Sequence, residues 1–248
     1  GFDWVLQRLL ADVAVGRADI VRMGAGGLLK EIVTRPQPRE GGAPLPVAPR
    51  AAKIAAVVLA AGQSRRMGRN KLLEPVDGRP MITHSVDTVL ASSGRPVIVV
   101  LGHQAEAVRA ALAGRPVQFV ENPDYAEGLS TSLRRGIAAL PEDCDGALVC
   151  LGDMPLVKAQ HLDKMIAGFN PVEGRAIVVP TSGGKRGNPV LWAKRFFPAM
   201  KAVAGDVGAK HLIGEHADLV CEVPFEDSAV LVDIDTPQAL AAPRAGAA

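Results

Sequence analysis

Short apolar runs alternate with amphipathic stretches from Lys53 onwards. The short runs, rich in β-branched residues, predict strands at Ile54–Leu59, Pro96–Leu101, Val117–Val120, Ala147–Leu151, Ala176–Pro180, Leu219–Val223 and Val230–Val232. Apolar residues at i, i+3 and i+4 predict helices at Met81–Ser92, Ala105–Ala113, Ser130–Leu140, Ala159–Phe169, Ala193–Ala199, Ala209–His216 and Pro237–Ala241. This alternation predicts βαβ units, and therefore a three-layer α/β fold whose mostly parallel sheet carries helices on both faces.

The region before this alternation has a different character. Helical spacing near its start is seen at Phe2, Val5, Leu6, Leu9 and Leu10. Residues 35–52 are dense in Pro and Gly, a composition typical of a linker. We therefore interpret residues 1–34 as the remnant of an upstream domain, 35–52 as a linker and 53–248 as the main domain. A helical appendage packed on the main domain is the alternative. The first residues lack a basic leader and an initiator methionine, so we expect no signal peptide and a piece of a longer chain.

Charge and cysteine content exclude several classes of protein. Lys+Arg 28 against Asp+Glu 26 gives a net charge of +2, and aromatic residues make up only 4%, so we expect no nucleic-acid partner. The 3 cysteines are too few and too scattered for a disulfide framework or a zinc site, which favours a cytoplasmic location. The longest apolar run is far shorter than the roughly 20 residues of a membrane span, so no membrane association is expected.

The segment after the first predicted strand, Leu59–Lys71, reads L-A-A-G-Q-S-R-R-M-G-R-N-K. Its small residues allow a ligand to approach the backbone, and successive amides can cradle phosphate oxygens. Arg66 and Lys71 would neutralise a triphosphate. The glycine spacing fits neither a Walker loop nor a dinucleotide fingerprint. Glycine and charge alone leave a tight turn with a solvated basic patch as an equal alternative.

The pattern L-A-A-G-x-S-x-R-M-G-x-x-K resembles the signature of nucleotidyltransferases with a Rossmann-like, glycosyltransferase-A-type fold, the nucleotide-diphospho-sugar transferase class. Within that class it is most similar to the cytidylyltransferases and guanylyltransferases of molybdenum cofactor biosynthesis. The resemblance extends from about Ile54 to Leu240. It implies that the loop wraps the triphosphate and that the lysine contacts the phosphates. The nucleotide-binding residues implied here are Leu59, Ala60, Ala61, Gly62, Ser64, Arg66 and Lys71.

A second motif follows the third predicted strand of this domain. Ser130 or Thr131 would cap the next helix, which explains the hydroxyls but not Asn122 and Gly128. The order N-P-x-x-x-x-G-x-x-x-S resembles the family segment that closes over base and ribose. The residues implied in that role are Asn122, Gly128, Ser130 and Ser132.

Carboxylates follow two more predicted strands. Asp153 could cap a turn, but a carboxylate at a strand end can also hold a hard metal ion that bridges phosphates. The resemblance implies that the aspartate of G-D-M-P is a Mg²⁺ ligand. Asp233 and Asp235 lie at i and i+2 of an extended segment and so face one side. Capping would account for Asp235 alone, and the family motif D-I-D-T-P implies a second metal carboxylate, with Asp233 preferred.

Two later segments resemble the acceptor site of the family. Gly187-Asn188-Pro189 is similar to a G-H-P-V segment, with Asn188 in place of the histidine, which puts any imidazole role in doubt. Asp206 lies in G-D-V-G-A-K, which is similar to G-D-x-G-A-R. The resemblance implies that these four residues line the acceptor site. A simple loop and a helix N-cap are the alternatives.

Together these motifs predict a Mg²⁺-dependent nucleotidyltransferase with Arg66, Lys71 and Asp153 as catalytic residues. The expected reaction joins a nucleotide from an NTP to the phosphate of molybdopterin and releases pyrophosphate. The loop reads Ala-Ala-Gly, as in the pyrimidine-using members of the family that it resembles, whereas Ala-Gly-Gly is common among the guanylyl-transferring members. The resemblance therefore implies CTP over GTP, since an extra side chain would narrow the base pocket. The first ten residues are similar to the last helix of molybdopterin-binding domains, and molybdoenzymes would then receive the cofactor. Guanylyl transfer, a sugar-phosphate acceptor and a non-catalytic binding module remain alternatives.

Overall fold

The computed structural model describes residues 18–23, 29–34, 51–64, 68–205 and 209–234, and the chain divides into two units, Gly1–Arg50 and Ala51–Ala248. In the first unit, β1 (Ala18–Met23) pairs antiparallel with β2 (Leu29–Thr34). Neither strand was predicted, because only the helical spacing at the start of this region was considered. Their sequences, ADIVRM and LKEIVT, carry the β-branched residues that favour strands. The helical spacing between Phe2 and Leu10 lies outside the described residues.

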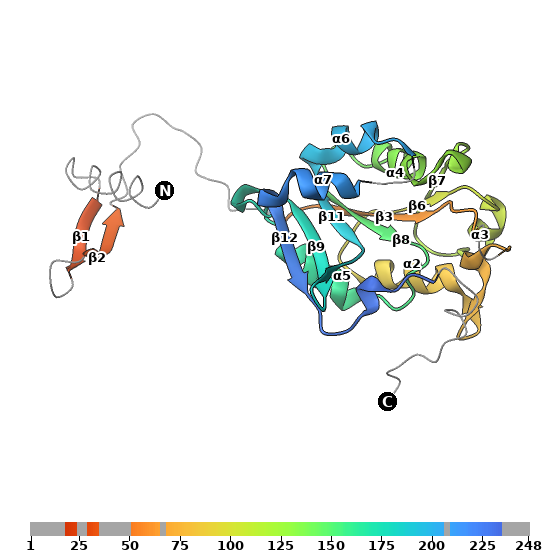
Figure 1. The fold of residues 1–248 in the computed structure, drawn as a ribbon, viewed down its shortest axis with the longest axis horizontal. Coiled ribbons are helices and arrows are strands. Elements are labelled where there is room, and N and C mark those ends of the chain that lie inside the picture. Colours follow the sequence, from red (N-terminus) through yellow and green to blue (C-terminus); the bar gives the residue numbers. More distant parts are fainter. Residues whose placement is uncertain (1–17, 24–28, 35–50, 65–67, 206–208, 235–248) are drawn as a thin grey trace. The chain divides into compact units, whose positions relative to one another are not determined.

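An eight-stranded sheet organises the second unit, in the order β10-β9-β11-β8-β3-β6-β7 with β12 beside β9 (Figure 1). The strands are β3 (Ile54–Ala60), β6 (Val97–Leu101), β7 (Gln118–Glu121), β8 (Gly146–Leu151), β9 (Ile177–Ser182), β10 (Lys185–Arg186), β11 (Val190–Ala193) and β12 (Val220–Pro224). The four strands from β8 to β7 are parallel, β12 is parallel to β9, and β11 runs antiparallel to both neighbours. Every residue of β3 is buried, because the sheet is covered on both faces.

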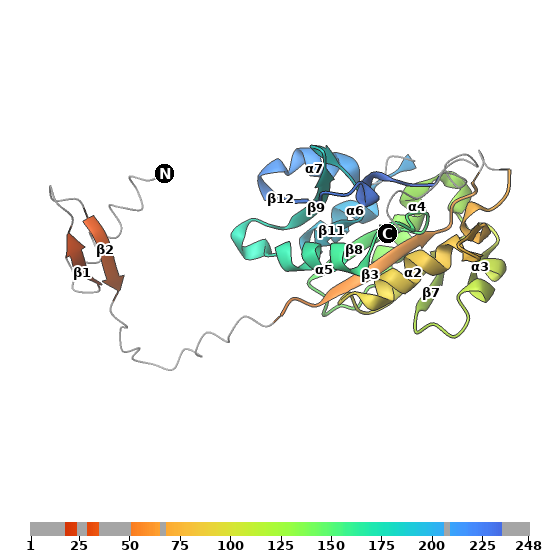
Figure 2. The ribbon, with the colours of Figure 1, turned by 90° about the horizontal axis from the view of Figure 1, so that it is seen from below.

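Helices cover both faces of this sheet. They are α2 (Met81–Ala91), α3 (Ala105–Ala111), α4 (Leu129–Ala138), α5 (Ala159–Gly168), α6 (Phe197–Ala202) and α7 (Lys210–Glu215). Figure 1 shows α4, α6 and α7 on one face, and Figure 2 shows α2 and α5 along the other. A Cβ at Gly136 of α4 would lie 2.5 Å from Val57 Cγ1, so a glycine lets this helix approach β3 closely. The predicted three-layer, mostly parallel α/β fold is confirmed. Among the described helices, none is long and apolar enough to cross a membrane.

The direction of the crossovers reverses beside β3. The chain steps from β3 through α2 to β6 and through α3 to β7, and it then returns through α4 to β8 on the other side of β3. The carboxyl ends of β3 and β8 therefore flank a topological switch point, where parallel sheets bind their ligands. The loops that follow these two strands carry Lys71 and Asp153.

Two predicted elements differ from the structure. Val230–Val232, predicted as a strand, falls mostly in the 3₁₀ turn η7 (Ala229–Leu231). Val230 is fully buried, so its apolar character reflects packing and not strand pairing. The helix predicted from Ala193 begins only at Phe197, because β11 and a 3₁₀ turn (η4, Lys194–Phe196) occupy the residues before it. The helix predicted at Pro237–Ala241 lies outside the described residues.

Candidate active site

The loop after β3 is closed by side-chain hydrogen bonds. Ser64 Oγ accepts a hydrogen bond from the backbone N–H of Lys71 at 3.1 Å, and Ser64 itself adopts a left-handed backbone with φ 51°. The buried Asn70 caps the 3₁₀ turn η1 (Lys71–Leu73), because its Oδ1 accepts from the N–H of Leu72 at 3.1 Å. These contacts return Lys71 to the carboxyl end of the sheet. Arg66 lies outside the described residues.

Lys71 and Asp153 meet at the switch point although they are 82 positions apart in the sequence. Lys71 Nζ donates to Asp153 Oδ2 at 2.5 Å, and the two side chains are only 12% and 16% exposed. The other carboxylate oxygen, Asp153 Oδ1, is buried and has no hydrogen-bond partner among the described residues. Such an oxygen is costly in a folded protein and indicates a place for a ligand.

The electrostatics of Asp153 follow from its burial. Burial raises the pKa of the Asp153 carboxyl above its usual range, and the negative charge of Asp233 raises it further. The Lys71 ammonium lowers this pKa but does not offset the burial. Among the described residues, Asp153 and Asp233 thus place two carboxyl groups near the Lys71 ammonium. A cation bound by oxygen ligands would stabilise this site.

Close packing behind Asp153 fixes its backbone. Gly152 N–H donates to Leu59 O at 3.0 Å, and Ser85 Oγ of α2 donates to Gly152 O at 2.9 Å. A Cβ at Gly152 would lie 2.8 Å from Ile82 Cδ1 and 3.1 Å from Leu59 O, so glycine at this position lets the residue after β8 lie close to α2 and β3. The backbone that leads into Asp153 is thus held by β3 and α2 at the end of β8.

Asp233 reaches the same place from the far end of the described chain. The backbone N–H of Ile234 donates to Asp153 O at 3.1 Å, and the Ile234 side chain is buried with Val76 and Met81. Asp233 is exposed beside them, and Asp235 lies outside the described residues. No group of three or more His, Cys, Asp or Glu among the described residues is arranged to hold a metal ion. Two carboxylates nevertheless fit Mg²⁺, which commonly binds one or two carboxylates together with waters and substrate phosphates.

The loop after β7 turns its polar groups inward. Asn122 is only 1% exposed, and its Nδ2 donates to Thr131 Oγ1 at 2.8 Å and to Ser132 Oγ at 3.0 Å. Its Oδ1 accepts from the N–H of Asp124 at 3.1 Å. Gly128, with φ 116°, precedes α4. The structure therefore places the Asn122 amide inside the loop, where it joins the loop to α4.

A cleft of about 570 Å³ joins these loops. It is lined by Leu59, Ala61, Gly62, Gln63, Ser64, Lys71, Leu72, Tyr125, Ala126, Gly128, Leu129, Ser132, Leu151 and Asp153. The structure thus brings together most of the residues predicted from the first two motifs with Asp153. Ala60, Asn122 and Ser130 are buried behind the cleft and do not line it.

Sequence reasoning missed Tyr125 and Leu129, which lie on the β7 side of the cleft. Leu129 is one of the few large apolar side chains that the described residues expose, at 41%. For Leu129, the signal in the sequence was its position directly after Gly128, a loop glycine of the second motif.

The segment predicted to bind the acceptor lies in an irregular hairpin. β10 and β11 both pair with β9, and the register moves by two residues between the pair Lys185–Ser182 and the pair Trp192–Ile177. Residues 187–189 form the resulting bulge. Gly187 N–H donates to Pro180 O and Asn188 N–H donates to Val230 O, both at 2.8 Å. The bulge residues do not line the cleft. Asp206 lies outside the described residues.

Comparisons with known proteins identify a family and several relatives. The sequence profile of a family described as "MobA-like NTP transferase domain" matches residues 56–219. The bifunctional protein GlmU of Kineococcus radiotolerans is 37% identical over 136 residues, which are 53% of this chain but only 28% of that protein. Nicotine blue oxidoreductase of Paenarthrobacter nicotinovorans is 29% identical over 74% of this chain and 92% of its own length.

Solved structures are similar over most of the second unit. Rv0371c from Mycobacterium tuberculosis has a TM-score of 0.67 at 29% identity and covers 76% of this chain and 96% of its own. The same protein in complex with manganese has a TM-score of 0.65 at 27% identity, over 76% of this chain and 96% of its own. A nucleotidyl transferase from Methanothermobacter thermautotroptrophicus has a TM-score of 0.66 at 26% identity, over 75% and 94%.

Proposed function

Since the chain belongs to the MobA-like NTP transferase family, we propose that it transfers a nucleotide from an NTP to the phosphate of an acceptor and releases pyrophosphate. The observation that carries this proposal is the buried Lys71–Asp153 pair at the switch point of the sheet, with one carboxylate oxygen left without a partner. A lysine point charge suits a phosphate, and a buried carboxylate oxygen suits a hard cation.

The chain's own residues act by position and charge. Lys71 Nζ would contact the phosphate oxygens of the NTP, and the amides of Gly62–Ser64 would lie along them. Asp153 and Asp233 would hold Mg²⁺, which, when bound, supplies positive charge against the phosphates. An oxygen of the acceptor's phosphate attacks the α-phosphorus, the bond between the α-phosphorus and its bridging oxygen breaks, and pyrophosphate leaves. Holding the two reactants in line accounts for much of the rate.

No protein nucleophile is required for this transfer. Cys150, three residues before Asp153, is the nearest thiol along the chain, and burial raises its pKa to about 12. It is therefore a neutral thiol at physiological pH and a poor nucleophile.

The loop after β3 supports CTP as the preferred nucleotide, with GTP as the second choice. Ala61 lines the cleft, and the Ala-Gly-Gly version of this loop would lack its methyl group. The extra methyl favours the smaller pyrimidine ring.

Molybdopterin is the acceptor that we propose. The support is the resemblance of several separate motifs, and of the first ten residues, to proteins that bind or nucleotidylate it. A sugar phosphate is the second candidate, since the fold alone does not determine the acceptor.

Two measurements test this function. The thermal shift produced by CTP, GTP, UTP and ATP, each with Mg²⁺, should be largest for CTP, since a ligand at 100 times its Kd stabilises by about 2.7 kcal/mol. Release of pyrophosphate should then depend on molybdopterin and not on glucose 1-phosphate. Absence of a shift with every NTP would contradict nucleotide transfer, whereas release with glucose 1-phosphate alone would contradict only the acceptor.

A further inference from the structure

The described chain ends in a segment that crosses the carboxyl edge of the sheet, residues 224–234, which we name the strap. The first part of the strap is anchored to β9 and α5. Phe225 N–H donates to Thr181 O at 2.8 Å, and Lys164 Nζ donates to Pro224 O at 2.7 Å. The buried His161 of α5 lies with its Nε2 3.1 Å from Asp227 Oδ2. The strap is therefore fixed to β9 and α5 where it begins.

The middle of the strap rests on the hairpin bulge. Asn188 N–H donates to Val230 O at 2.8 Å, and Val230 is fully buried. A Cβ at Gly187 would lie 2.1 Å from Val230 O and 2.7 Å from Val230 C. These are backbone atoms, so they cannot turn aside as a side chain could. Any side chain at Gly187 must therefore displace either the strap or the bulge on which it rests.

The last part of the strap carries Asp233 to Asp153. The N–H of Ile234 donates to Asp153 O at 3.1 Å, and its side chain is buried with Val76 and Met81. Val76 follows closely on η1, the turn that begins with Lys71. Through the contacts of its neighbour Ile234, Asp233 is thus linked to two segments: the one that carries Asp153 and the one that carries Lys71.

We infer that Gly187 is a positioning residue for the Asp153–Asp233 pair: because it has no side chain, the strap can lie on the bulge, and the strap then holds Asp233 beside Asp153. The inference rests on the proposed function, since it assumes that this pair holds the cation. It changes the role expected for Gly187 from the resemblance. Gly187 serves the cation site through Val230, and a substitution there should impair cation binding more than acceptor binding.

The test is the binding of Mn²⁺ alone, measured from the signal of free Mn²⁺ in electron paramagnetic resonance. Gly187→Ala should weaken Mn²⁺ binding by about 10- to 100-fold, the range for partners that orient metal ligands. Gly214→Ala is the matched control, because a Cβ at Gly214 of α7 meets nothing within 4 Å. It should bind Mn²⁺ as the wild type does.

A second variant covers the case in which Gly187→Ala does not fold. Ile234→Val removes one methyl group from the buried end of the strap and should weaken Mn²⁺ binding in the same direction but less. In steady-state kinetics, both variants should raise the Mn²⁺ concentration needed for half-maximal rate and leave the KM of the acceptor unchanged.

The outcomes separate the two proposals. A folded Gly187→Ala protein with wild-type Mn²⁺ affinity and a raised acceptor KM would overturn the inference and return Gly187 to the acceptor site. If Gly187→Ala does not fold, wild-type Mn²⁺ affinity in Ile234→Val would overturn it. A wild-type protein that binds neither Mn²⁺ nor any NTP would overturn the proposed function, and the inference with it.

Discussion

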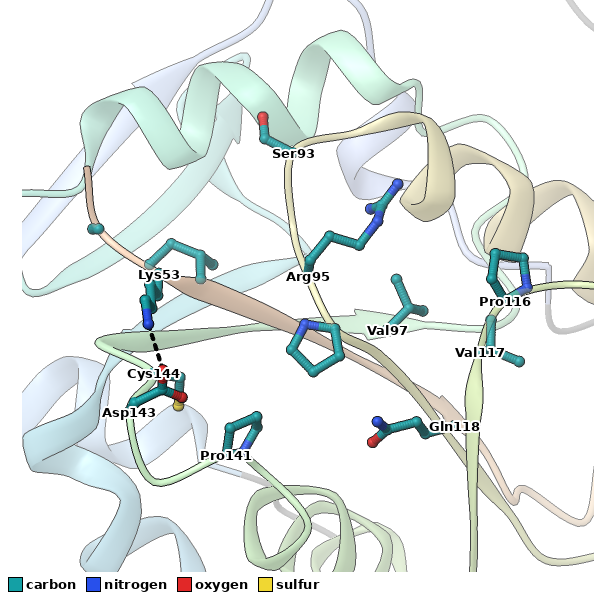
Figure 3. Close-up of a pocket in the computed structure, with 13 residues that line it drawn as sticks. Lys53, Ser93, Arg95, Val97, Pro116, Val117, Gln118, Pro141, Asp143 and Cys144 are labelled. Atoms are coloured by element: carbon teal, nitrogen blue, oxygen red, sulfur yellow. Dashed lines mark hydrogen bonds and ion pairs between the residues drawn. The ribbon is translucent and has the colours of Figure 1, made fainter. Parts of the chain in front are cut away.

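The two ends of the central sheet each carry a hollow, and the larger one is at the amino ends of the strands. That hollow, of about 670 Å³, lies beside the start of β3, β6 and β7 and is lined by residues that include Lys53, Arg95, Gln118 and Asp143 (Figure 3). The cleft at the carboxyl ends is smaller, about 570 Å³, yet it holds the buried Lys71–Asp153 pair. Volume alone does not distinguish the two.

Hydrogen bonding does distinguish them. In the amino-end hollow, Lys53 is paired with Asp143, and both side chains are more than half exposed. The Arg95 guanidinium donates to the carbonyls of Ser92 at 3.1 Å and of Gly94 at 2.6 Å, next to the end of α2. These charged groups have structural partners, whereas Asp153 Oδ1 in the cleft has none among the described residues. A buried polar atom without a hydrogen-bond partner at the carboxyl ends of the strands therefore indicates the candidate site better than the volume of the hollow does.

Replacing one aspartate at each end gives the largest expected difference. Asp153→Asn should lower turnover by more than about 100-fold. Replacing a group that only orients a metal ligand already lowers activity by about 10- to 100-fold, and Asp153 is proposed as a ligand itself. Asp143→Asn, the matched control in the amino-end hollow, should leave turnover unchanged. The measurement is the rate of pyrophosphate release at saturating substrates. Wild-type turnover in Asp153→Asn would remove Asp153 from the site.

The lysines at the two ends should differ by a smaller factor. Lys71→Met should raise the KM of the NTP about 10- to 100-fold, because a hydrogen bond from a charged donor contributes about 1.5–3 kcal/mol. Lys53→Met should change this KM less than about threefold, since an exposed ion pair contributes little. If the two substitutions raised the KM equally, the difference in hydrogen bonding between the two hollows would not identify the active site.

The base preference tests the cleft more finely. Ala61→Gly should raise the ratio of kcat/KM for GTP over CTP about tenfold, because one methyl group contributes about 1–3 kcal/mol of discrimination. Ala61 is buried and packs against Gly102, where an added Cβ would lie 2.7 Å from the Ala61 Cβ. If both efficiencies fell together and the ratio stayed constant, Ala61 would act only through this packing, and the preference for CTP would lose its support.

The smallest effect concerns pH and stability. Burial raises the pKa of Asp153, so the folded protein binds this proton more tightly than the unfolded chain does. The contribution of Asp153 to the free energy of unfolding of the metal-free protein should therefore decrease as pH rises from the usual carboxyl pKa to the raised one. The lowered pKa values of Asp87 and Asp227 act in the opposite direction in both the wild type and Asp153→Asn, so the measurement is the difference in Tm between these two proteins from acidic to neutral pH. A wild-type Tm that rises relative to that of Asp153→Asn would mean that Lys71 outweighs burial.

The sequence predicted the parallel part of the sheet because β3, β6 and β8 are continuous apolar runs, the pattern of strands buried on both faces. It did not predict β10 and β11, because these strands have only two and four residues and are separated by a bulge. The strand pair β1–β2 was also missed, since the region was assigned from the apolar spacing of its first ten residues.

In the candidate site, too, residues that belong to a short motif could be predicted, whereas contacts between residues far apart in the sequence could not. Lys71 and Asp153 could be named from their motifs, and the topology of the sheet explains why they meet. The inward amide of Asn122 could not be predicted, because its partners Thr131 and Ser132 belong to the next helix and are placed by packing. Nor does any motif show that Gly187 supports the backbone of Val230, 43 positions further along. The roles of all the site residues stay predictions, and Arg66, Asp206 and Asp235 lie outside the described residues.

The place of β8 in the sheet also determines when the site can form during synthesis. β6 and β7 each follow their neighbour after a single helix, whereas β8 must return to β3 across all the elements between them. Such long-range pairing forms late, because the intervening loop must be closed first. Lys71 leaves the ribosome long before Asp153, and Asp233 follows only with the strap. The nascent chain can therefore pair three of the eight strands, β3, β6 and β7, before Asp153 is synthesised. Under the proposed function, the cleft would become able to hold a nucleotide and its cation only after the last described residues have docked.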